Sequence, residues 1–217
     1  MSTSALLAPL TQGIQALGLS LTDAQVQQLL AYQDLLIKWN KVYNLTAVRD
    51  PAQMLTHHLL DSLAVVAPLR RHRAQAAGAD TLMDVGSGGG LPGVVLAICC
   101  AGVQVSCVDT VGKKAAFIRQ VAAELRLPHL RGEHARVEQL PGRYDLITSR
   151  AFASLDDFVR LTRAQLAPGG VWMAMKGKMP EDEIQSLPED IEVFHVEHLA
   201  VPQLDAERCL IWMRLRA

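Results

Sequence analysis

The spacing of hydrophobic positions predicts helices in the first third of the chain. Residues Thr22 to Gln25 have the form of a capping box, and apolar side chains then recur at helical spacing. This pattern predicts an amphipathic helix from about Asp23 to Lys41. A second apolar stripe predicts a helix over Ala52–Ala67, which Pro68 is expected to end. Residues 1–70 are therefore expected to form a helical N-terminal extension.

From Thr81 onward, short apolar runs alternate with helical patterns, which is typical of a doubly wound parallel sheet. The predicted strands are Thr81–Val85, Gln104–Val108, a short strand near Leu130, Tyr144–Ser149, Val171–Lys176, Ile191–Leu199 and Arg208–Leu215, the last two as an antiparallel pair. The predicted helices are Pro92–Cys100, Lys113–Leu125 and Ser154–Leu166. We therefore expect a Rossmann-like α/β core over residues 81–217, preceded by a connector at 71–80, with the whole chain 1–217 as a single domain.

Composition and length agree with one soluble domain. A chain of 217 residues, 50% of them hydrophobic, can bury one substantial core and leaves little room for a second. No apolar run approaches the roughly 18 residues that a spanning helix needs. No Lys or Arg precedes Lys38, so the positive region of a secretory signal is missing. We expect a cytoplasmic monomer that has no membrane contact.

Cysteine spacing argues against a metal site or a disulfide scaffold, and net charge argues against general binding of nucleic acid. The four cysteines, at positions 99, 100, 107 and 209, have neither C-x-x-C spacing nor the density of a disulfide scaffold, so we expect structural residues and no metal site. The net charge of -1 is unlike that of a typical nucleic-acid binder. Any contact with RNA therefore needs a local basic patch, for which residues 70–73 and the pair Lys113 and Lys114 are candidates.

The glycine-rich segment Asp84–Gly93 carries the clearest chemical signal. It lies between a predicted strand and a predicted helix, where glycines allow a tight turn and a close approach of backbone to ligand. Residues Gly88–Gly93 satisfy the G-x-G-x-x-G dinucleotide pattern. Residues Asp84–Gly88 have the D-x-G-x-G spacing that is typical of S-adenosylmethionine enzymes. Asp109 ends the next predicted strand and is expected to accept hydrogen bonds from the ribose of either cofactor.

Three functions fit this loop, and methyl transfer fits best. A dinucleotide-dependent oxidoreductase would need a separate substrate domain and a proton-relay residue, and the sequence supplies neither convincingly. A noncatalytic module that binds RNA or a nucleotide is the third possibility, but the cofactor residues are intact. We therefore expect S-adenosyl-L-methionine as the cofactor, with S-adenosyl-L-homocysteine as the product.

Several motifs outside the loop are more specific than the fold. They are Trp39–Thr46, His57–Ser62, Ser149–Ala153 and Lys176-Gly177, which together with Asp84–Gly93 extend over nearly the whole chain. In these segments the chain resembles the small-subunit ribosomal RNA methyltransferase G family, also called GidB. The strings W-N-x-x-x-N-L-T and S-R-A-F-A are specific to that family. One variation is Gly89, where relatives can carry proline.

The resemblance implies a class I methyltransferase fold with a mostly parallel seven-stranded sheet flanked by helices. It also implies methyl transfer to N7 of one guanine in a decoding-region loop of 16S ribosomal RNA, which we expect to be presented in a 30S particle. The residues expected to bind the cofactor are Asp84, Gly86, Gly88, Leu91, Asp109, Val137, Glu138 and Arg150.

The chemistry of guanine N7 explains why no catalytic base is evident. N7 has an available lone pair at neutral pH, so the enzyme needs proximity and orientation more than a general base. We expect Arg150 and Lys176 to orient neighbouring oxygens. Phe152 is expected either to stack on the target base or to pack under the glycine loop. The RNA-binding candidates are Asn44, Arg49, Lys113, Lys114, Phe152 and Lys178. His57 and His58 are weaker candidates, since a helical histidine is more often structural.

Overall fold

The computed structural model describes residues 4–75 and 80–216. Within these residues seven strands form one sheet of order β3-β2-β1-β4-β5-β7-β6. The strands are β1 Thr81–Val85, β2 Gln104–Asp109, β3 Leu130–His134, β4 Tyr144–Arg150, β5 Leu166–Lys176, β6 Ile191–His198 and β7 Cys209–Leu215. Strands β1 to β5 are parallel, and β7 pairs antiparallel with both β5 and β6. The predicted mostly parallel seven-stranded sheet is therefore confirmed.

Alternating side chains along each strand divide the hydrophobic core into two layers. Leu82 and Met173, for example, pack in one layer, while Met83 and Trp172 pack in the other. The first layer lies beneath α6 (Gly93–Cys99), α7 (Gly112–Glu124) and the N-terminal helices. The second lies beneath α8 (Leu155–Thr162), with the short helices η2 (Val137–Gln139), η3 (Arg163–Gln165) and α9 (Glu181–Gln185) nearby. Helices therefore cover both faces of the sheet, as a doubly wound fold requires.

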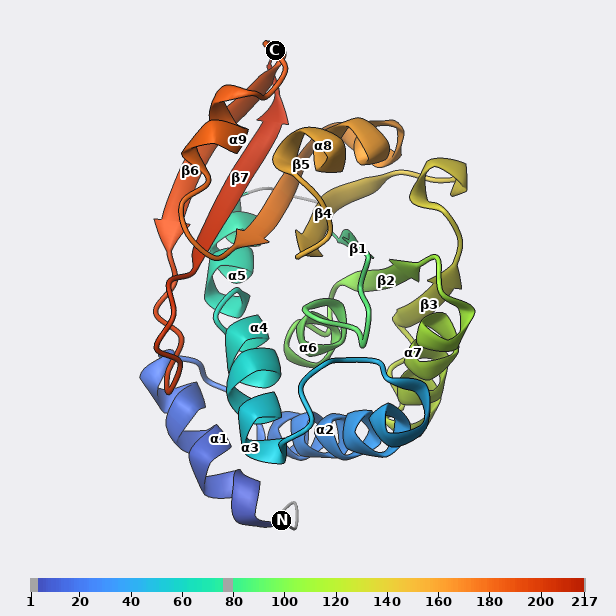
Figure 1. The fold of residues 1–217 in the computed structure, drawn as a ribbon, viewed down its shortest axis with the longest axis vertical. Helices are drawn as coiled ribbons and strands as arrows, with labels where there is room; N and C mark the ends of the chain where they lie inside the picture. Colours follow the sequence, from blue (N-terminus) through green and yellow to red (C-terminus); the bar gives the residue numbers. More distant parts are fainter. Residues whose placement is uncertain (1–3, 76–79, 217) are drawn as a thin grey trace.

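The N-terminal extension wraps around the core. It consists of α1 Ser4–Ala16, α2 Asp23–Tyr43, α3 Pro51–Met54, the π-helix η1 Leu55–Leu60, α4 Asp61–Leu63 and α5 Val66–Gln75. In Figure 1, α2 runs below α6 and α7, while α3 to α5 form a column beside the sheet. The predicted capping box at Thr22 and Gln25 is present and starts α2. None of the helices in the described ranges is long and apolar enough to cross a membrane.

The second predicted helix differs from expectation. The chain turns after Leu63 and continues as α5 to Gln75, so Pro68 does not end it. Pro68 lies in the first turn of α5, where its missing N–H has no intrahelical partner to lose. The first part of the predicted connector 71–80 is therefore helical, and its residues 76–79 lie outside the described residues.

Strand β5 also begins earlier than the sequence predicted. The turn expected at residues 168–170 lies inside the strand as an irregularity, where pairing with β4 shifts from Tyr144↔Leu166 to Leu146↔Val171. The four cysteines are all buried and free, as expected for structural residues. Burial raises the pKa of the Cys107 thiol well above its usual range, so this thiol remains uncharged.

Candidate functional site

The glycine loop after β1 lies at the carboxyl edge of the sheet. The amides of Gly86 and Ser87 donate to the carbonyl oxygen of Val108 at 2.9 and 3.1 Å. The amide of Gly88 donates to Asp109 Oδ2 at 3.1 Å. Gly86 and Gly88 have φ values of +65° and +58°, in the left-handed region that glycine adopts without strain. The loop is therefore tied to the end of β2 in one conformation.

Asp84 supports this loop from beneath. It is fully buried, and its Oδ2 accepts a hydrogen bond from the amide of Gly93 at 2.8 Å. Its Oδ1 is buried and has no hydrogen-bond partner among the described residues. Burial raises the pKa of this carboxyl to about 7. Asp84 does not line either of the cavities described below, so its position is that of a brace for the loop, and cofactor contact remains a prediction.

Two cavities meet at the loop. One, of about 460 Å³, is lined by Thr46, His58, Asp61, Arg150 and Arg208, and we call it the arginine cavity. The other, also of about 460 Å³, is lined by Asp109, Lys114, Val137, Glu138 and Phe152, and we call it the Asp109 cavity. Gly86 and Ala151 border both cavities. The two spaces are therefore neighbours on either side of the first glycine of the loop.

Asp109 is held firmly at the mouth of its cavity. Its Oδ1 accepts from the amide of Val111 at 2.9 Å, and its Oδ2 lies 3.3 Å from Lys114 Nζ. Val137 and Glu138, expected to bind the cofactor, line the same cavity. The set offers a fixed carboxylate, glycines without Cβ atoms and an apolar wall. These residues fit a nucleoside with a ribose diol, which is the part of S-adenosylmethionine that such an edge binds.

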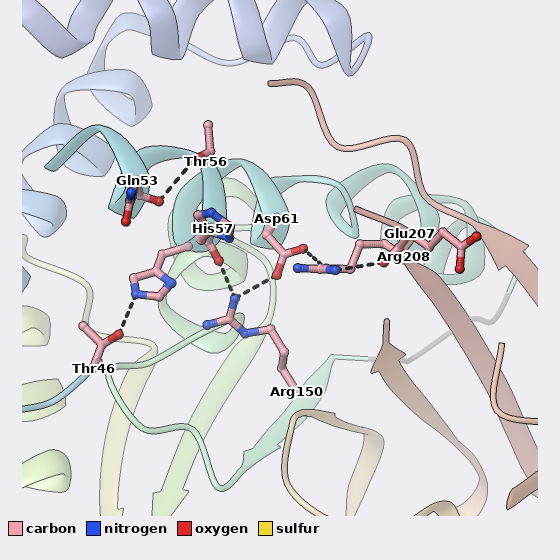
Figure 2. A network of polar contacts seen from close by, with 9 residues as sticks. Thr46, Gln53, Thr56, His57, Asp61, Arg150, Glu207 and Arg208 are labelled. Carbon is pink, nitrogen blue, oxygen red and sulfur yellow. Dashed lines mark hydrogen bonds and ion pairs between the residues drawn. The ribbon is translucent and has the colours of Figure 1, made fainter. Parts of the chain in front are cut away.

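The arginine cavity is built around a buried carboxylate that the sequence did not single out. Asp61 is 1% exposed, and it accepts from Arg150 Nη1 at 2.8 Å and from Arg208 Nε at 2.7 Å. Figure 2 shows the two guanidinium groups approaching Asp61 from two sides. Arg150 Nη1 also donates to the main-chain carbonyl of His57 at 2.8 Å. Two cations around one carboxylate leave this cavity with a net positive charge.

The π-helix η1, which directly precedes Asp61 in the chain, also lines the arginine cavity. It carries His58, whose Nε2 lies 2.8 Å from Thr46 Oγ1. His58 Nδ1 is buried and has no hydrogen-bond partner in the part of the chain that the structure describes. Burial, assisted by the charge of Arg150, lowers the pKa of His58 to about 4. His58 is therefore neutral at physiological pH and does not act as a cation toward RNA.

The structure explains the string W-N-x-x-x-N-L-T. Asn40 Oδ1 accepts from the amide of Thr46 at 2.9 Å, and Asn40 Nδ2 donates to the carbonyl of Val48 at 3.1 Å. Asn44 ends α2 in the left-handed conformation, and its Oδ1 accepts from Arg49 Nη2 at 3.2 Å. The motif thus folds the loop after α2 back against the arginine cavity, where Thr46 lies in its wall.

The remaining predicted site residues are divided between the cavities and the surface. Lys176 lines the arginine cavity and donates to the carbonyl of Ala153 at 2.9 Å and to Glu183 at 2.7 Å. Leu91 also lines that cavity. Lys113 and Lys178 are exposed.

Phe152 lies on the other side from the arginine cavity. It lines the Asp109 cavity and packs on Gly86, where an added Cβ would come within 2.5 Å of its ring. Its ring also meets that of Phe158 edge-on at 6.4 Å. This position does not favour the predicted stacking on an RNA base, and it explains why residue 86 must lack a Cβ.

The sequence analysis did not identify Arg208 as a site residue, and it included Asp61 only as part of the motif His57–Ser62. Asp61 lies inside the motif His57–Ser62, so a search for acids in that motif would have identified it. Arg208 follows a loop with no motif and meets Asp61 only across 147 positions of sequence. No local pattern marks such a residue.

Comparison with known proteins identifies relatives along almost the entire length. The model of the family described as "GidB: rRNA small subunit methyltransferase G" matches residues 25–211. Two relatives bear the name ribosomal RNA small subunit methyltransferase G. The protein of Paracidovorax citrulli is 62% identical, over 100% of this chain and 93% of its own length. That of Methylibium petroleiphilum is 65% identical, over 96% of this chain and 94% of its own.

Solved structures share the fold at low identity. The N-methyltransferase NodS of Bradyrhizobium japonicum, in complex with S-adenosyl-L-homocysteine, has a TM-score of 0.58 and 16% identity, over 86% of this chain and 98% of its own. The glycopeptide N-methyltransferase MtfA, in complex with sinefungin, has a TM-score of 0.58 and 10% identity, over 70% of this chain and 87% of its own. The predicted class I methyltransferase fold is therefore confirmed.

Proposed function

The chain belongs to the rRNA small subunit methyltransferase G family, and we propose that it transfers a methyl group from S-adenosylmethionine to N7 of one guanine in a decoding-region loop of 16S ribosomal RNA. The observation that supports this most is the meeting of two unlike cavities at Gly86 and Ala151. One presents a carboxylate suited to ribose hydroxyls, and the other presents arginines suited to phosphate. A donor and an acceptor held at such a junction need little further activation.

The Asp109 cavity is the proposed donor side. S-adenosylmethionine supplies a methyl group that its sulfonium makes electrophilic. Asp109 accepts hydrogen bonds from the ribose hydroxyls, in an orientation fixed by the amides of Val111 and Gly88. Val137 and Glu138 flank the base, and Gly86 lets the backbone approach the donor closely. Gly88 and Leu91 line the arginine cavity, so they are assigned to the methionine end of the donor, which extends past Gly86. Phe152, which lines the same cavity, is assigned to this side as well.

The arginine cavity is the proposed acceptor side. A cation directly on N7 would compete with the methyl group for the lone pair, so the cations of this cavity must be held elsewhere. Asp61 and the carbonyl of His57 fix Arg150, and Glu183 fixes Lys176. Arg150 and Lys176 then orient neighbouring oxygens of the nucleotide or the carboxylate of the donor. No residue has to remove a proton, since N7 carries none.

The rim of the arginine cavity is the proposed contact with flanking RNA. Asn44 and Arg49 lie before and after Thr46 on the loop that follows α2, and Lys178 follows Lys176 after β5. The base must leave its stack to enter, as is usual for recognition of RNA loops. Lys113 remains a candidate for a phosphate contact, whereas Lys114 is paired with Asp109 on the donor side.

The proposed substrate is a preassembled 30S particle, and the proposed form of the enzyme is a cytoplasmic monomer of one domain. A net charge of -1 gives little general attraction to RNA phosphates. A folded particle presents the target loop in place, so fewer phosphate contacts are required than on free RNA. We therefore expect weak binding to protein-free 16S RNA.

Incorporation of labelled methyl groups tests the proposal. The chain is incubated with S-adenosylmethionine labelled in the methyl group and with 30S particles from a strain that lacks the enzyme, and the RNA is digested to nucleosides. We expect the label in 7-methylguanosine, with much less on protein-free 16S RNA. The Asp109→Asn variant is expected to lose it, because an amide is a poorer acceptor for the ribose diol. Label in another nucleoside would contradict guanine N7, and no label despite cofactor binding would favour a noncatalytic module.

A further inference from the structure

The N-terminal extension reaches the glycine loop through one buried side chain. Tyr32 lies in the middle of α2, is fully buried, and donates its hydroxyl to the main-chain carbonyl of Gly89 at 2.6 Å. Leu36, one turn later, covers the same residue, since a Cβ at position 89 would lie 3.0 Å from Leu36 Cδ1. Helix α2 therefore closes over the outer part of the loop.

This contact differs in origin from the other bonds that hold the loop. Gly86, Ser87 and Gly88 are tied to the end of β2. Gly93 is tied to Asp84 at the end of β1. The bond from Tyr32 comes from 57 residues earlier in the chain, outside the α/β core. The amides of Gly90 and Leu91 donate to the carbonyl of Ser87 within the loop at 2.7 and 3.1 Å. The carbonyl of Gly89 is thus the point at which α2 adds a bond from outside the core.

The environment of Tyr32 keeps its hydroxyl in the donor role. Its ring packs near that of Phe117 in α7, with centroids 6.3 Å apart. Burial raises the pKa of the Tyr32 phenol well above its usual range, so the hydroxyl stays protonated. Gly89 is itself buried, and without Tyr32 its carbonyl would lose its partner in a place where an unpaired polar group is costly.

We infer that Tyr32 is a positioning residue for the cofactor: by holding the carbonyl of Gly89 it fixes, together with the bond from the Gly90 amide to Ser87, the Gly89–Gly90 peptide in the orientation that a bound S-adenosylmethionine requires. The inference rests on the proposed cofactor site. A loop that lacks this anchor has more conformations to lose on binding, and that loss weakens affinity. On this account the N-terminal extension is part of the cofactor site without contacting the cofactor.

The test compares two variants that each lose one buried hydroxyl. Tyr32→Phe removes only the bond to Gly89. Thr148→Val is the matched control, since Thr148 Oγ1 donates to the carbonyl of Met173 at 2.8 Å inside the sheet and touches neither cavity. Titration calorimetry with S-adenosyl-L-homocysteine gives the Kd, thermal unfolding gives the Tm, and hydrogen exchange of the ligand-free protein reports on the amides of the glycine loop.

We expect Tyr32→Phe to raise the Kd about tenfold and to speed exchange at Gly88 to Gly90. Both variants are expected to lower the Tm by a similar amount, since each loses one buried hydrogen bond. Thr148→Val is expected to leave the Kd and the hydrogen exchange of the glycine loop unchanged. An unchanged Kd in Tyr32→Phe, or an equal rise in both variants, would overturn the inference while leaving the proposed function intact. A wild-type protein that binds no S-adenosyl-L-homocysteine would overturn the cofactor site and the inference with it.

Discussion

A buried aspartate organises the cationic side of the site at the scale of single residues. Asp61 binds Arg150 and Arg208, which come from β4 and from the residue before β7. Burial of a carboxylate costs free energy, and this cost is offset here because each of the two oxygens of Asp61 accepts a hydrogen bond from a guanidinium group. The pairing also holds two flexible side chains in place, and in the proposed function phosphate or the cofactor carboxylate meets this preformed cation pair.

The variant Asp61→Asn tests this organisation. It keeps the shape but removes the charge, leaving two cations close together without a counter-charge. We expect the free energy of unfolding to fall by about 2–4 kcal/mol and methyl transfer to fall more than tenfold. Urea unfolding and the labelled-methyl assay measure the two effects. Arg214→Gln, which breaks the exposed pair with Glu192, is the control and should lower the free energy of unfolding far less than Asp61→Asn does. Wild-type activity in Asp61→Asn would contradict the assigned role.

His58 should make stability depend on pH in a defined direction. Its pKa is about 4 in the folded chain and 6.5 when unfolded, so between these values the unfolded chain binds the extra proton. The free energy of unfolding therefore falls as the pH decreases from 6.5 to 4, by up to about 3 kcal/mol from this residue. Asp84 acts in the opposite direction, because its pKa of about 7 in the folded chain lies above the ordinary 3.8.

Comparison of the wild type with the variant His58→Gln separates the titration of His58 from that of Asp84, since both the wild type and the variant retain Asp84. Glutamine can still bond to Thr46 and does not titrate. The stability of the wild type relative to the variant should fall between pH 7 and pH 4 in urea unfolding. A difference that stays constant over this range would show that His58 is not held neutral by the fold.

At the scale of elements, the loop after α2 connects a family motif to the acceptor cavity. Asn40 fixes Thr46 and Val48, and Thr46 reaches His58 on the π-helix. Helices of this type are rare and often occur at functional sites. The loop and η1 therefore form one wall that the α/β core does not supply.

Replacement of Asn40 tests whether this wall serves the RNA. Asn40→Ala leaves the amide of Thr46 and the carbonyl of Val48 without their partner, so the loop should move. We expect the KM for 30S particles to rise severalfold and the Kd for S-adenosyl-L-homocysteine to stay the same. Gln165→Ala is the matched control, because it also removes a buried side-chain amide that bonds to a main-chain carbonyl, that of Leu140, and Gln165 lines neither cavity. Equal effects on cofactor and RNA would place the loop on the donor side instead.

Features that leave a local pattern could be predicted from the sequence, whereas contacts between residues far apart in the chain could not. Short apolar runs predicted all seven strands, because burial on both faces of a sheet leaves a local signal in the sequence. The glycine loop and Asp109 were identified because they follow strands directly. Local patterns wrongly predicted that Pro68 ends a helix and that β5 begins at Val171. At both positions tertiary packing determines where the element begins or ends. Tyr32 and Arg208 act across 57 and 147 residues, so no local pattern marks them.

At the scale of the whole molecule, two layers of helices hold a sheet whose carboxyl edge carries two cavities of unlike charge. The N-terminal extension closes one side of that edge through Tyr32, Thr46 and His58. Residues of the N-terminal extension therefore contact the glycine loop and line the arginine cavity at the edge of the class I fold. In the proposed function the extension supplies part of the acceptor wall and, through Tyr32, a bond that holds the glycine loop.

Mapping of the methylated base in cells shows directly whether the chain methylates N7 of a guanine in 16S RNA. Ribosomal RNA from a strain lacking the enzyme, complemented with either the wild-type chain or Arg150→Gln, is treated with borohydride and aniline, which cleave at N7-methylguanine. The account predicts one cleavage in the decoding region of 16S RNA with the wild type, and its loss or strong reduction with Arg150→Gln. No wild-type-dependent cleavage at a guanine of 16S RNA would contradict it.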